Sequence, residues 1–480
     1  MGNLPNPRHM LIILFFSSVL RSSFSFSSAL FSPPDNLLVD CGSSYSTGLN
    51  DRRIFLPDFN GDSVRLISDE PSFAVAAKNN LVLEDETYAP LYRTARVFTG
   101  SSSYVFRINN KGTHIVRLHF YPFSNSDQDL SSAQFHVVAS GFVLLRNFTA
   151  SSNLSSSVKE FIISVEVDEL TISFVPSTFL SLAFVNAIEV ISAPADLIRD
   201  TGRLVKPNNV ETFYGLSNQV LETLFRVNVG GPKVTPFNDT LWRTWSPDNA
   251  FFHSNSSTKT VYFSGRIMYQ KYGASREVAP DNVYNTARVL GANSSDLISR
   301  MTWSFPVNQG YRYLVRMHLC DIASLALNEL YFSVYINGYL AYEDFDISAA
   351  TSHYLASPYY VDFVVNAGSS GILSVSVGPS TFGESSIVNG ILNGLEILKI
   401  NNSVRSFDME LPIAFLVHRS TEGALTAAFR SLICWFAFVL LIVSGFMSIW
   451  RWGIQPRNHI TWSPLSMNAQ ESQITKADQF

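Results

Sequence analysis

Residues 114–120 read His-Ile-Val-Arg-Leu-His-Phe, and their central motif, Val-Arg-Leu-His at 116–119, returns later in the chain as Val-Arg-Met-His at 315–318. Apolar and polar side chains alternate along this stretch, which is typical of a β-strand. The return of the same strand motif indicates an internal duplication.

Further blocks recur in the same order, and the offset between partners drifts from 188 to 207 residues, as small loop insertions would produce. The matching pairs are Val39–Gly42 with Val227–Gly230, Tyr92–Val97 with Tyr284–Val289, Phe135 and Gly141 with Phe332 and Gly338, Pro176-Ser177 with Pro379-Ser380, and Asn186–Val190 with Asn393–Ile397. We therefore define a first repeat, 34–195, and a second repeat, 212–400, which a polar linker, 196–211, is expected to join.

Each repeat is expected to consist of short strands. Strand-like stretches lie at 161–167, 332–336 and 373–377, and turn signals lie at 110–112, 139–141 and 336–338. Outside one apolar run near the C-terminus, helical periodicity is confined to residues 218–224. The pattern predicts an all-β protein in which each repeat is an antiparallel β-sandwich, most simply a jelly roll.

The two ends of the sequence predict a membrane topology. Arg8 and His9 precede a short apolar run, so residues 1–28 are expected to be a signal peptide. Residues 431–450 carry no charge and have the length of a spanning helix, so a transmembrane helix is predicted at 430–450. An extracellular stalk, 401–429, and a short cytoplasmic tail, 451–480, result from that assignment.

Six Asn-X-Ser/Thr sequons agree with this topology, because all of them lie between the two apolar runs. They are Asn147, Asn153, Asn238, Asn255, Asn293 and Asn401. These six are the predicted glycosylation sites of a lumenal or extracellular body.

Composition excludes several classes of protein. The 34 basic and 39 acidic residues give a formal charge of −5, and no basic stripe of the kind that binds nucleic acid is present. The three cysteines, Cys41, Cys320 and Cys434, have no metal-site spacing, so no metal site is predicted. Cys41 and Cys320 are either a disulfide pair or two separate buried thiols.

Several longer blocks together resemble the tandem malectin-like ectodomain of plant receptor-like kinases of the Catharanthus roseus type. They are Pro33–Ser43, Phe184–Glu189, Phe225–Gly231, Trp242–Asp248, Val315–Asp321 and, in the tail, Trp462–Ser466. The resemblance implies two tandem malectin-like jelly rolls followed by one transmembrane helix. It also implies a single-pass type I protein of the plasma membrane whose ectodomain is extracellular.

The resembled family continues into a cytoplasmic Ser/Thr kinase, but the sequence contains no kinase glycine-rich loop, V-A-I-K lysine, H-R-D or D-F-G motif. The chain is therefore expected to be no enzyme and to need no cofactor. It is either a co-receptor or decoy without its own kinase, or a truncated form of a receptor-like kinase. A cell-wall lectin that anchors without signalling is a third alternative.

The resemblance also suggests ligands and partners. Members of the family perceive secreted peptides, often with a lipid-anchored co-receptor, and touch cell-wall carbohydrate, and full-length receptor-like kinases are further candidate partners. The aromatic residues Tyr88, Tyr92, Phe120 and Tyr121 are the candidate ligand-binding residues, because aromatic rings stack on sugar faces. The alternative is that these rings fill the core of the sandwich.

Two features invite a catalytic interpretation, and neither is adopted. His119 and His318 recur in both repeats, which favours a structural position over an active site. The carboxylate clusters at 84–86 and 343–344 show no glycosidase motif, and solvated loop charges explain them better. No catalytic residue is predicted.

Overall fold

The structure is a computed structural model of the chain, which divides into residues 1–415 and residues 416–480. It describes residues 31–59, 61–78, 87–124, 129–150, 157–254, 257–271, 273–291, 299–381, 388–407, 440, 442–444 and 447. Both repeats lie in the first unit.

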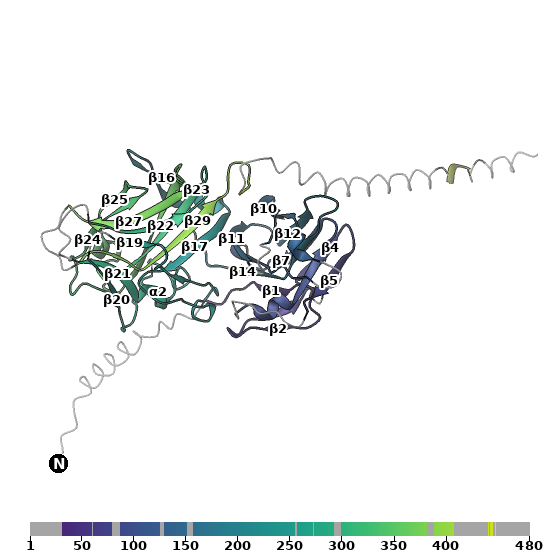
Figure 1. Cartoon of the computed structure of the whole chain (residues 1–480), viewed down its shortest axis with the longest axis horizontal. Coiled ribbons are helices and arrows are strands. Elements are labelled where there is room, and N and C mark those ends of the chain that lie inside the picture. Colours follow the sequence, from purple (N-terminus) through teal and green to yellow (C-terminus); the bar gives the residue numbers. More distant parts are fainter. Residues whose placement is uncertain are drawn as a thin grey trace, which may run out of the picture. The chain divides into compact units, whose positions relative to one another are not determined.

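The first repeat is built almost entirely from strands (Figure 1). They are β1 (Asn36–Asp40), β2 (Thr47–Gly48), β3 (Ile54–Pro57), β4 (Val64–Ser68), β5 (Ser72–Ala76), β6 (Thr94–Phe98), β7 (Ser102–Arg107), β8 (Gly112–Phe120), β9 (Phe135–Ala139), β10 (Phe142–Phe148), β11 (Ser157–Val165), β12 (Glu169–Pro176), β13 (Ala183–Val185) and β14 (Ala187–Ser192). Two 3₁₀ turns interrupt them, η1 (Ala89–Arg93) and η2 (Leu130–Ser132).

The second repeat has the same plan. Its strands are β17 (Leu221–Asn228), β18 (Ser246–Pro247), β19 (Phe252–Ser254), β20 (Thr258–Tyr262), β21 (Thr286–Gly291), β22 (Met301–Pro306), β23 (Arg312–Cys320), β24 (Tyr331–Ile336), β25 (Tyr339–Asp346), β26 (Pro358–Asn366), β27 (Ile372–Pro379), β28 (Val388–Leu392) and β29 (Gly394–Ile400). Its short helices are η4 (Pro236–Asn238), α2 (Asp281–Tyr284) and α3 (Ile347–Ala350). The prediction of a mainly β protein is confirmed.

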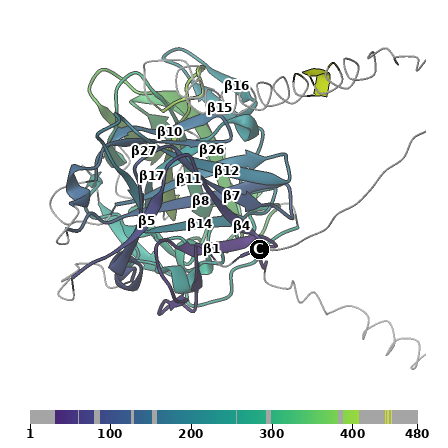
Figure 2. The same cartoon turned by 90° about the vertical axis from the view of Figure 1, so that its right-hand side faces the viewer.

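One long sheet runs through both repeats. Two of its strands, β15 (Thr201–Val205) and β16 (Val210–Tyr214), come from the segment between the repeats. The strands lie in the order β16-β15-β26-β23-β29-β17-β11-β8-β14-β1-β3-β2, and β11 of the first repeat pairs with β17 of the second. Figure 2 shows β17, β11, β8, β14 and β1 one after another. The repeats are therefore joined by backbone hydrogen bonds as well as by side chains.

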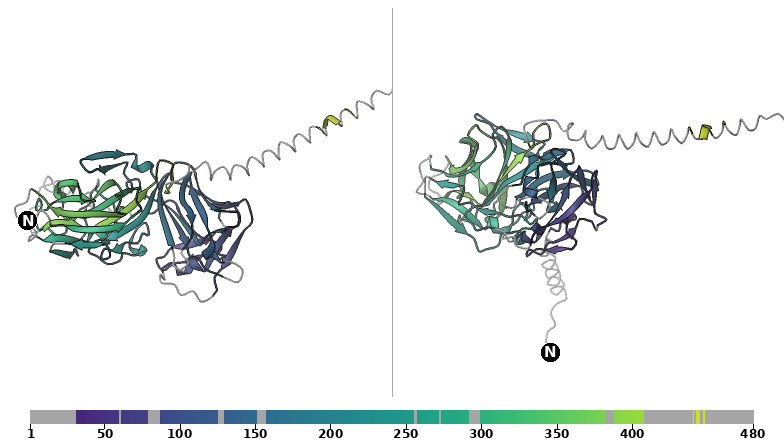
Figure 3. Two further views of the ribbon diagram at one scale, coloured as in Figure 1. Left: turned by 45° about the horizontal axis from the view of Figure 1, so that its top comes forward. Right: turned by 45° about the vertical axis from the view of Figure 1, so that its right-hand side comes forward.

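Each repeat adds a five-stranded and a three-stranded sheet, and the core lies between these and the long sheet (Figure 3). The five-stranded sheet of the first repeat has the strand order β10-β9-β12-β7-β4. Apolar side chains of β7, β9 and β12 in this sheet pack against those of β8 and β14 in the long sheet. This core also takes in Leu241, Leu314 and Leu398 from the second repeat. Burial is thus continuous across the junction.

Two predictions about the middle of the chain need revision. The stretch 218–224, for which the sequence indicates a helical period, holds the end of η3 (Leu216–Asn218) and the start of β17, because the long sheet offers hydrogen-bond partners to its backbone. Residues 196–211, expected to form a linker, contain β15 (Thr201–Val205) and the start of β16 (Val210–Tyr214). This hairpin pairs with β26 at the edge of the long sheet.

The segment after β29 returns to the first repeat. Phe407 is buried in that core beside Phe161, and the Lys399 ammonium donates to the Phe407 carbonyl at 2.7 Å. Ser406 and Phe407, within the predicted stalk, are therefore packed, whereas residues 403–405 are exposed. No helix among the described residues is long and apolar enough to cross a membrane. Most of the predicted span 430–450 lies outside the described residues, as do 1–28 and 451–480.

Candidate functional site at the junction of the repeats

A row of alternating acidic and basic side chains crosses the long sheet from one repeat into the other. Strand register sets the order, because Arg117 lies opposite Glu160 and Glu189, and Arg316 lies opposite Asp362 and Glu396. The row, here called the charged row, consists of Asp51, Arg53, Glu189, Arg117, Glu160, Arg226, Glu396, Arg316 and Asp362. All nine residues are buried.

The centre of the charged row joins the two repeats. Arg117 places Nε 2.7 Å from Glu160 Oε2 and Nη1 2.7 Å from Glu189 Oε2. Arg226 places Nη2 2.7 Å from Glu160 Oε1 and Nε 2.5 Å from Glu396 Oε1. Glu160, from the first repeat, is therefore held between an arginine of each repeat, an arrangement that satisfies both of its oxygens.

The neighbouring arginines keep these carboxylates ionised. Burial alone raises the pKa of Glu160, but Arg226 and Arg117 overcome that effect and lower it to about 2. The pKa of Glu396 is likewise held well below its usual value, mainly by Arg226 against the effect of burial. Because a carboxylate with so low a pKa binds a proton weakly, neither acid suits the role of a general base.

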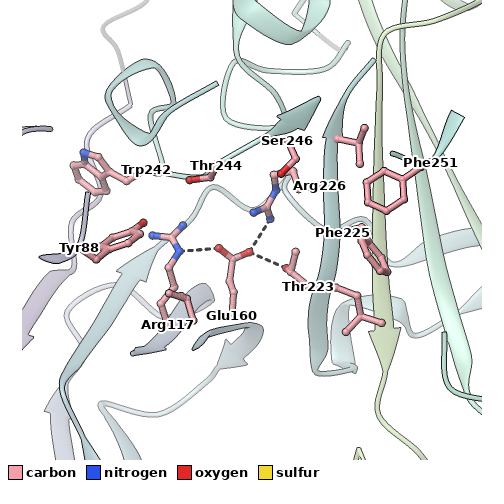
Figure 4. A pocket seen from close by; sticks show the side chains of 13 residues that line it. Tyr88, Arg117, Glu160, Thr223, Phe225, Arg226, Trp242, Thr244, Ser246 and Phe251 are labelled. Atoms are coloured by element: carbon pink, nitrogen blue, oxygen red, sulfur yellow. Dashed lines mark hydrogen bonds and ion pairs between the residues drawn. The ribbon is translucent and has the colours of Figure 1, made fainter. Parts of the chain in front are cut away.

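A cavity of about 240 Å³ opens beside the centre of the charged row. It is lined from the first repeat by Tyr88, Arg117, Val158 and Glu160, and from the second by Thr223, Leu224, Phe225, Arg226, Val227, Trp242, Thr244, Ser246 and Phe251. Figure 4 shows Tyr88 and Trp242 on one side, the Phe225 and Phe251 rings on the other, and the Arg117–Glu160–Arg226 bridge between them. We call this cavity the junction pocket.

The backbone at Trp242 is strained in a way that concerns the junction pocket. Its φ is +53°, a left-handed value that a bulky side chain rarely adopts. Such strain persists only where the surroundings enforce it, and it tends to mark functional positions. Thr244 and Ser246 add hydroxyl groups on the same wall, so the pocket combines aromatic rings with hydrogen-bonding groups.

The four sequence-predicted ligand residues occupy two different environments. Tyr88 lines the junction pocket at 8% exposure, and its ring meets His119 edge to face at 4.9 Å. Phe120 is fully buried, Tyr121 is 1% exposed, and Tyr92 stacks on Tyr121 at 5.3 Å. Only Tyr88 of the four reaches the pocket, and the other three rings fill the core, which was the alternative for these residues.

The repeated histidines hold equivalent positions inside the fold. His119 Nε2 lies 2.8 Å from Glu189, and His318 Nε2 lies 3.4 Å from Glu396. Burial lowers the pKa of both histidines. A tyrosine hydroxyl faces the other ring nitrogen in each repeat, which fits a structural role.

Several other residues singled out in the sequence also have defined surroundings. Cys41 and Cys320 are both buried free thiols, so the disulfide alternative is wrong here. Asp344, in the second acidic cluster, accepts hydrogen bonds from Ser380 and Thr381, whereas residues 84–86 lie outside the described residues. Arg288, in the repeated block Tyr284–Val289, pairs with Asp248.

Three of the predicted glycosylation residues are described, namely Asn147, Asn238 and Asn401; the other three lie outside the described residues. Asn238 is exposed at the end of η4. Asn401 accepts a hydrogen bond from the Val220 amide and donates to the Asn402 carbonyl. Occupancy of all six remains a prediction.

Arg226 is the junction residue that sequence reasoning missed. Aligning the repeats on Val39 and Val227 places it at the position of Leu38, and both residues lie opposite the equivalent glutamate of their repeat. A charged residue at an aligned apolar position is the signal that could have identified it.

Comparison with known proteins agrees with this architecture. Residues 39–400 match the malectin-like domain family. A probable receptor-like protein kinase of Arabidopsis thaliana is 44% identical over 82% of this chain and 47% of its own length. THESEUS 1, a receptor-like protein kinase of the same plant, is 42% identical over 83% of this chain and 46% of its own. The chain thus spans about half the length of these curated relatives.

Solved structures give the same result. The extracellular domain of ANXUR2 from Arabidopsis thaliana superposes with a TM-score of 0.70 at 30% identity, over 78% of this chain and 98% of that one. A plant complex of the peptide RALF23 with FER and LLG2 contains a chain that matches with a TM-score of 0.66 at 30% identity, over 80% of this chain and all of that one. On this evidence the chain belongs to the malectin-like family, alongside the ectodomains of the Arabidopsis receptor-like kinases.

Proposed function

We propose that the chain is a cell-surface recognition protein whose two tandem jelly rolls bind an extracellular ligand. The family match over residues 39–400 carries this proposal, together with the solved complex in which a related chain, FER, is assembled with the peptide RALF23 and with LLG2. A secreted peptide is therefore the first candidate ligand, and a lipid-anchored co-receptor is the first candidate partner.

The junction pocket supports recognition rather than catalysis. Its charged groups are already paired, as for Arg117 and Glu160 at 2.7 Å, while its Trp242 and Tyr88 rings face a cavity. Buried, satisfied charge pairs with aromatic walls suit a rigid binding surface. A peptide side chain inserted between the rings would bury apolar area without breaking the charged row.

The proposed topology places the recognition unit outside the plasma membrane. A signal peptide at 1–28, a transmembrane helix at 430–450 and six occupied sequons complete this proposal. The two alternatives for signalling, a co-receptor or decoy without a kinase and a truncated receptor kinase, differ only beyond residue 480. Sequencing the transcript through its 3′ end distinguishes them.

The direct test is a binding titration of the full chain, purified in detergent, against secreted signalling peptides, with and without an LLG2-type co-receptor. We expect saturable binding that Trp242→Ala weakens at least ten-fold. Phe179→Ala, a change at a loop position with 83% exposure, is the matched control and should leave affinity unchanged. Absence of binding to any peptide, alone or with co-receptor, would refute a peptide-receptor role.

Cell-wall carbohydrate is the second candidate ligand, and the composition of the junction pocket favours it. Two aromatic rings stand beside the hydroxyl groups of Thr244 and Ser246, and the volume of about 240 Å³ suits a single sugar ring more than a chain. A glycan array probed with the full chain tests this candidate. Binding that survives Trp242→Ala would place any sugar elsewhere.

A further inference from the structure

Arg226 keeps one hydrogen-bonding nitrogen free at the junction pocket. Its Nε donates to Glu396 at 2.5 Å, its Nη2 donates to Glu160 at 2.7 Å, and its guanidinium lies over the Trp245 ring. Its Nη1 makes no hydrogen bond with any described residue and is not among the buried polar atoms that lack a partner, so it is accessible from the cavity. Because the side chain is 8% exposed and held by three neighbours, this donor is fixed in place.

The other free polar groups of the cavity can also donate. The hydroxyl groups of Thr244 and Ser246 line the same cavity and have no hydrogen-bond partner among the described residues. Glu160, the one carboxylate in the lining, is already occupied, because it accepts from Arg117 and Arg226, each at 2.7 Å. The pocket thus offers three free donors and no free carboxylate, which suits a ligand that carries an anionic acceptor.

Aromatic rings stand on both sides of these donors (Figure 4). Tyr88 and Trp242 form one wall, and Phe225 and Phe251, whose ring centroids are 5.3 Å apart, form the other. The Arg226 guanidinium lies between the two walls, with its ion pair to Glu160. A ligand that fills this space must therefore carry an apolar group and an anion close together.

We propose that the junction pocket captures the C-terminal residue of a peptide, with its α-carboxylate on Arg226 Nη1 and the two hydroxyl groups and with an apolar side chain between the rings. This assignment rests on the recognition function proposed above. A C-terminal residue carries both groups on one carbon atom, and capture of a terminal carboxylate is a recurrent mode of peptide recognition. An aspartate or glutamate within a chain brings the carboxylate without the apolar side chain.

The size of the cavity favours a chain end over an internal segment. Its volume of about 240 Å³ is below the ~300–1,000 Å³ of typical small-molecule pockets, which suits one residue better than a chain that passes through. Val158 and Ser246 in the lining are both exposed, so the pocket opens to solvent. The preceding residues of the peptide can leave through that opening.

The carboxylate is expected to contribute mainly to selectivity. Arg226 is already shared by Glu160 and Glu396, so its charge is largely compensated, and the peptide adds only a few charge-assisted hydrogen bonds. Replacing the free carboxylate by a carboxamide keeps the shape and the apolar contacts, but it removes the charge and sets an N–H group against the Nη1 donor. We expect this single change to weaken binding about ten-fold.

The test compares acetyl-diglycyl-phenylalanine, which has a free carboxylate, with its C-terminal amide on the full chain in detergent. Saturation-transfer NMR should show the strongest transfer to the phenyl protons of the acid. Titration should give a dissociation constant about ten-fold lower for the acid than for the amide. Acetyl-diglycyl-aspartate amide, whose carboxylate is in the side chain, should bind no better than the phenylalanine amide.

Two protein variants remove donors without altering the charged row. Thr244→Val and Ser246→Ala should each lower the affinity for the free acid at least three-fold, with an unchanged unfolding temperature. Ser369→Ala removes an exposed serine hydroxyl of the second repeat that does not line the pocket, and it is the matched control that should bind the acid as the parent does.

Equal affinities for the acid and the amide, or Thr244→Val and Ser246→Ala variants that bind the acid as well as the parent, would overturn the proposal. Glucuronate that displaces the acid from the pocket at a lower concentration than the peptide itself requires would assign the site to an acidic sugar and would also overturn it. If longer secreted peptides still bind in those cases, the recognition function stands and their site lies elsewhere. A chain that binds neither the short peptides nor any secreted peptide would refute both proposals.

Discussion

Replacing Asp40 by asparagine should stabilise the protein at neutral pH and remove part of its pH dependence. Asp40 ends β1 at 1% exposure and accepts hydrogen bonds from the hydroxyls of Thr47 and Thr94. Burial, with a further contribution from the nearby Asp58, raises its pKa to about 6. The second repeat carries Asn228 at this position, which shows that the fold accepts an amide there.

The magnitude comes from the difference between the folded and unfolded states. A carboxyl whose pKa rises from 3.8 to about 6 on folding favours the folded state only while it is protonated. Its stabilising contribution is complete below pH 3.8 and is lost as the pH rises through 6. At ~1.36 kcal/mol per pKa unit, the ionised group costs up to about 3 kcal/mol at pH 7.

Chemical denaturation of the parent chain and Asp40→Asn from pH 4 to pH 7 measures this effect. We expect the variant to gain stability over the parent as the pH rises, by about 3 kcal/mol at pH 7 and by almost nothing at pH 4. The reciprocal change Asn228→Asp should lose stability at pH 7 and recover part of it at pH 4. An equal gain at both pH values, or a loss at pH 7, would refute the electrostatic reasoning.

Three further outcomes are expected, each measured by thermal or denaturant unfolding. Arg226→Leu, which restores the residue of the first repeat, should cost about 3–5 kcal/mol, because Glu160 and Glu396 each lose a buried ion pair. Removing the exposed Arg65 ion pair should cost at most ~1 kcal/mol. Gly42→Ala should destabilise the protein strongly, because Gly42 has a φ of +77° and the new Cβ would lie 2.4 Å from a carbonyl oxygen. Gly48→Ala is the control and should be tolerated, because its Cβ would meet no atom within 4 Å. Tyr121→Ala should lower stability by about 3–5 kcal/mol through a core cavity, so any loss of ligand binding must disappear once the unfolded fraction is subtracted.

Much of the fold could be predicted from the sequence because the repeats carry local signals. The turn at Asn337-Gly338 adopts left-handed φ values of +52° and +80°, as an Asn-Gly hairpin requires. The strand motif at 116–119 lies within β8, as its alternation predicts. The polar residues of this motif, Arg117 and His119, are nevertheless buried. Their burial could not be predicted locally, because the carboxylates that pair with them come from strands far away in the sequence.

The site was harder to predict because it belongs to neither repeat alone. Tyr88 could be selected as an aromatic loop residue, but Trp242 and Ser246 become pocket residues only when β17 pairs with β11. Pairing between distant strands depends on tertiary packing, for which a single sequence holds no local pattern. Segment 196–211 resembles a linker for the same reason, since its partner strand lies more than a hundred residues further on.

The charged row also has a consequence for biosynthesis. The first repeat leaves the ribosome before the second, and domains tend to fold in that order. At that stage its Glu160 still lacks Arg226, and its Arg117 still lacks the Leu241 carbonyl. The β11 side of the nascent first repeat must therefore stay hydrated until residues 220–245 have emerged. Closure of the junction is then a late step of folding, and the half-made protein is exposed to chaperones and proteases until it occurs.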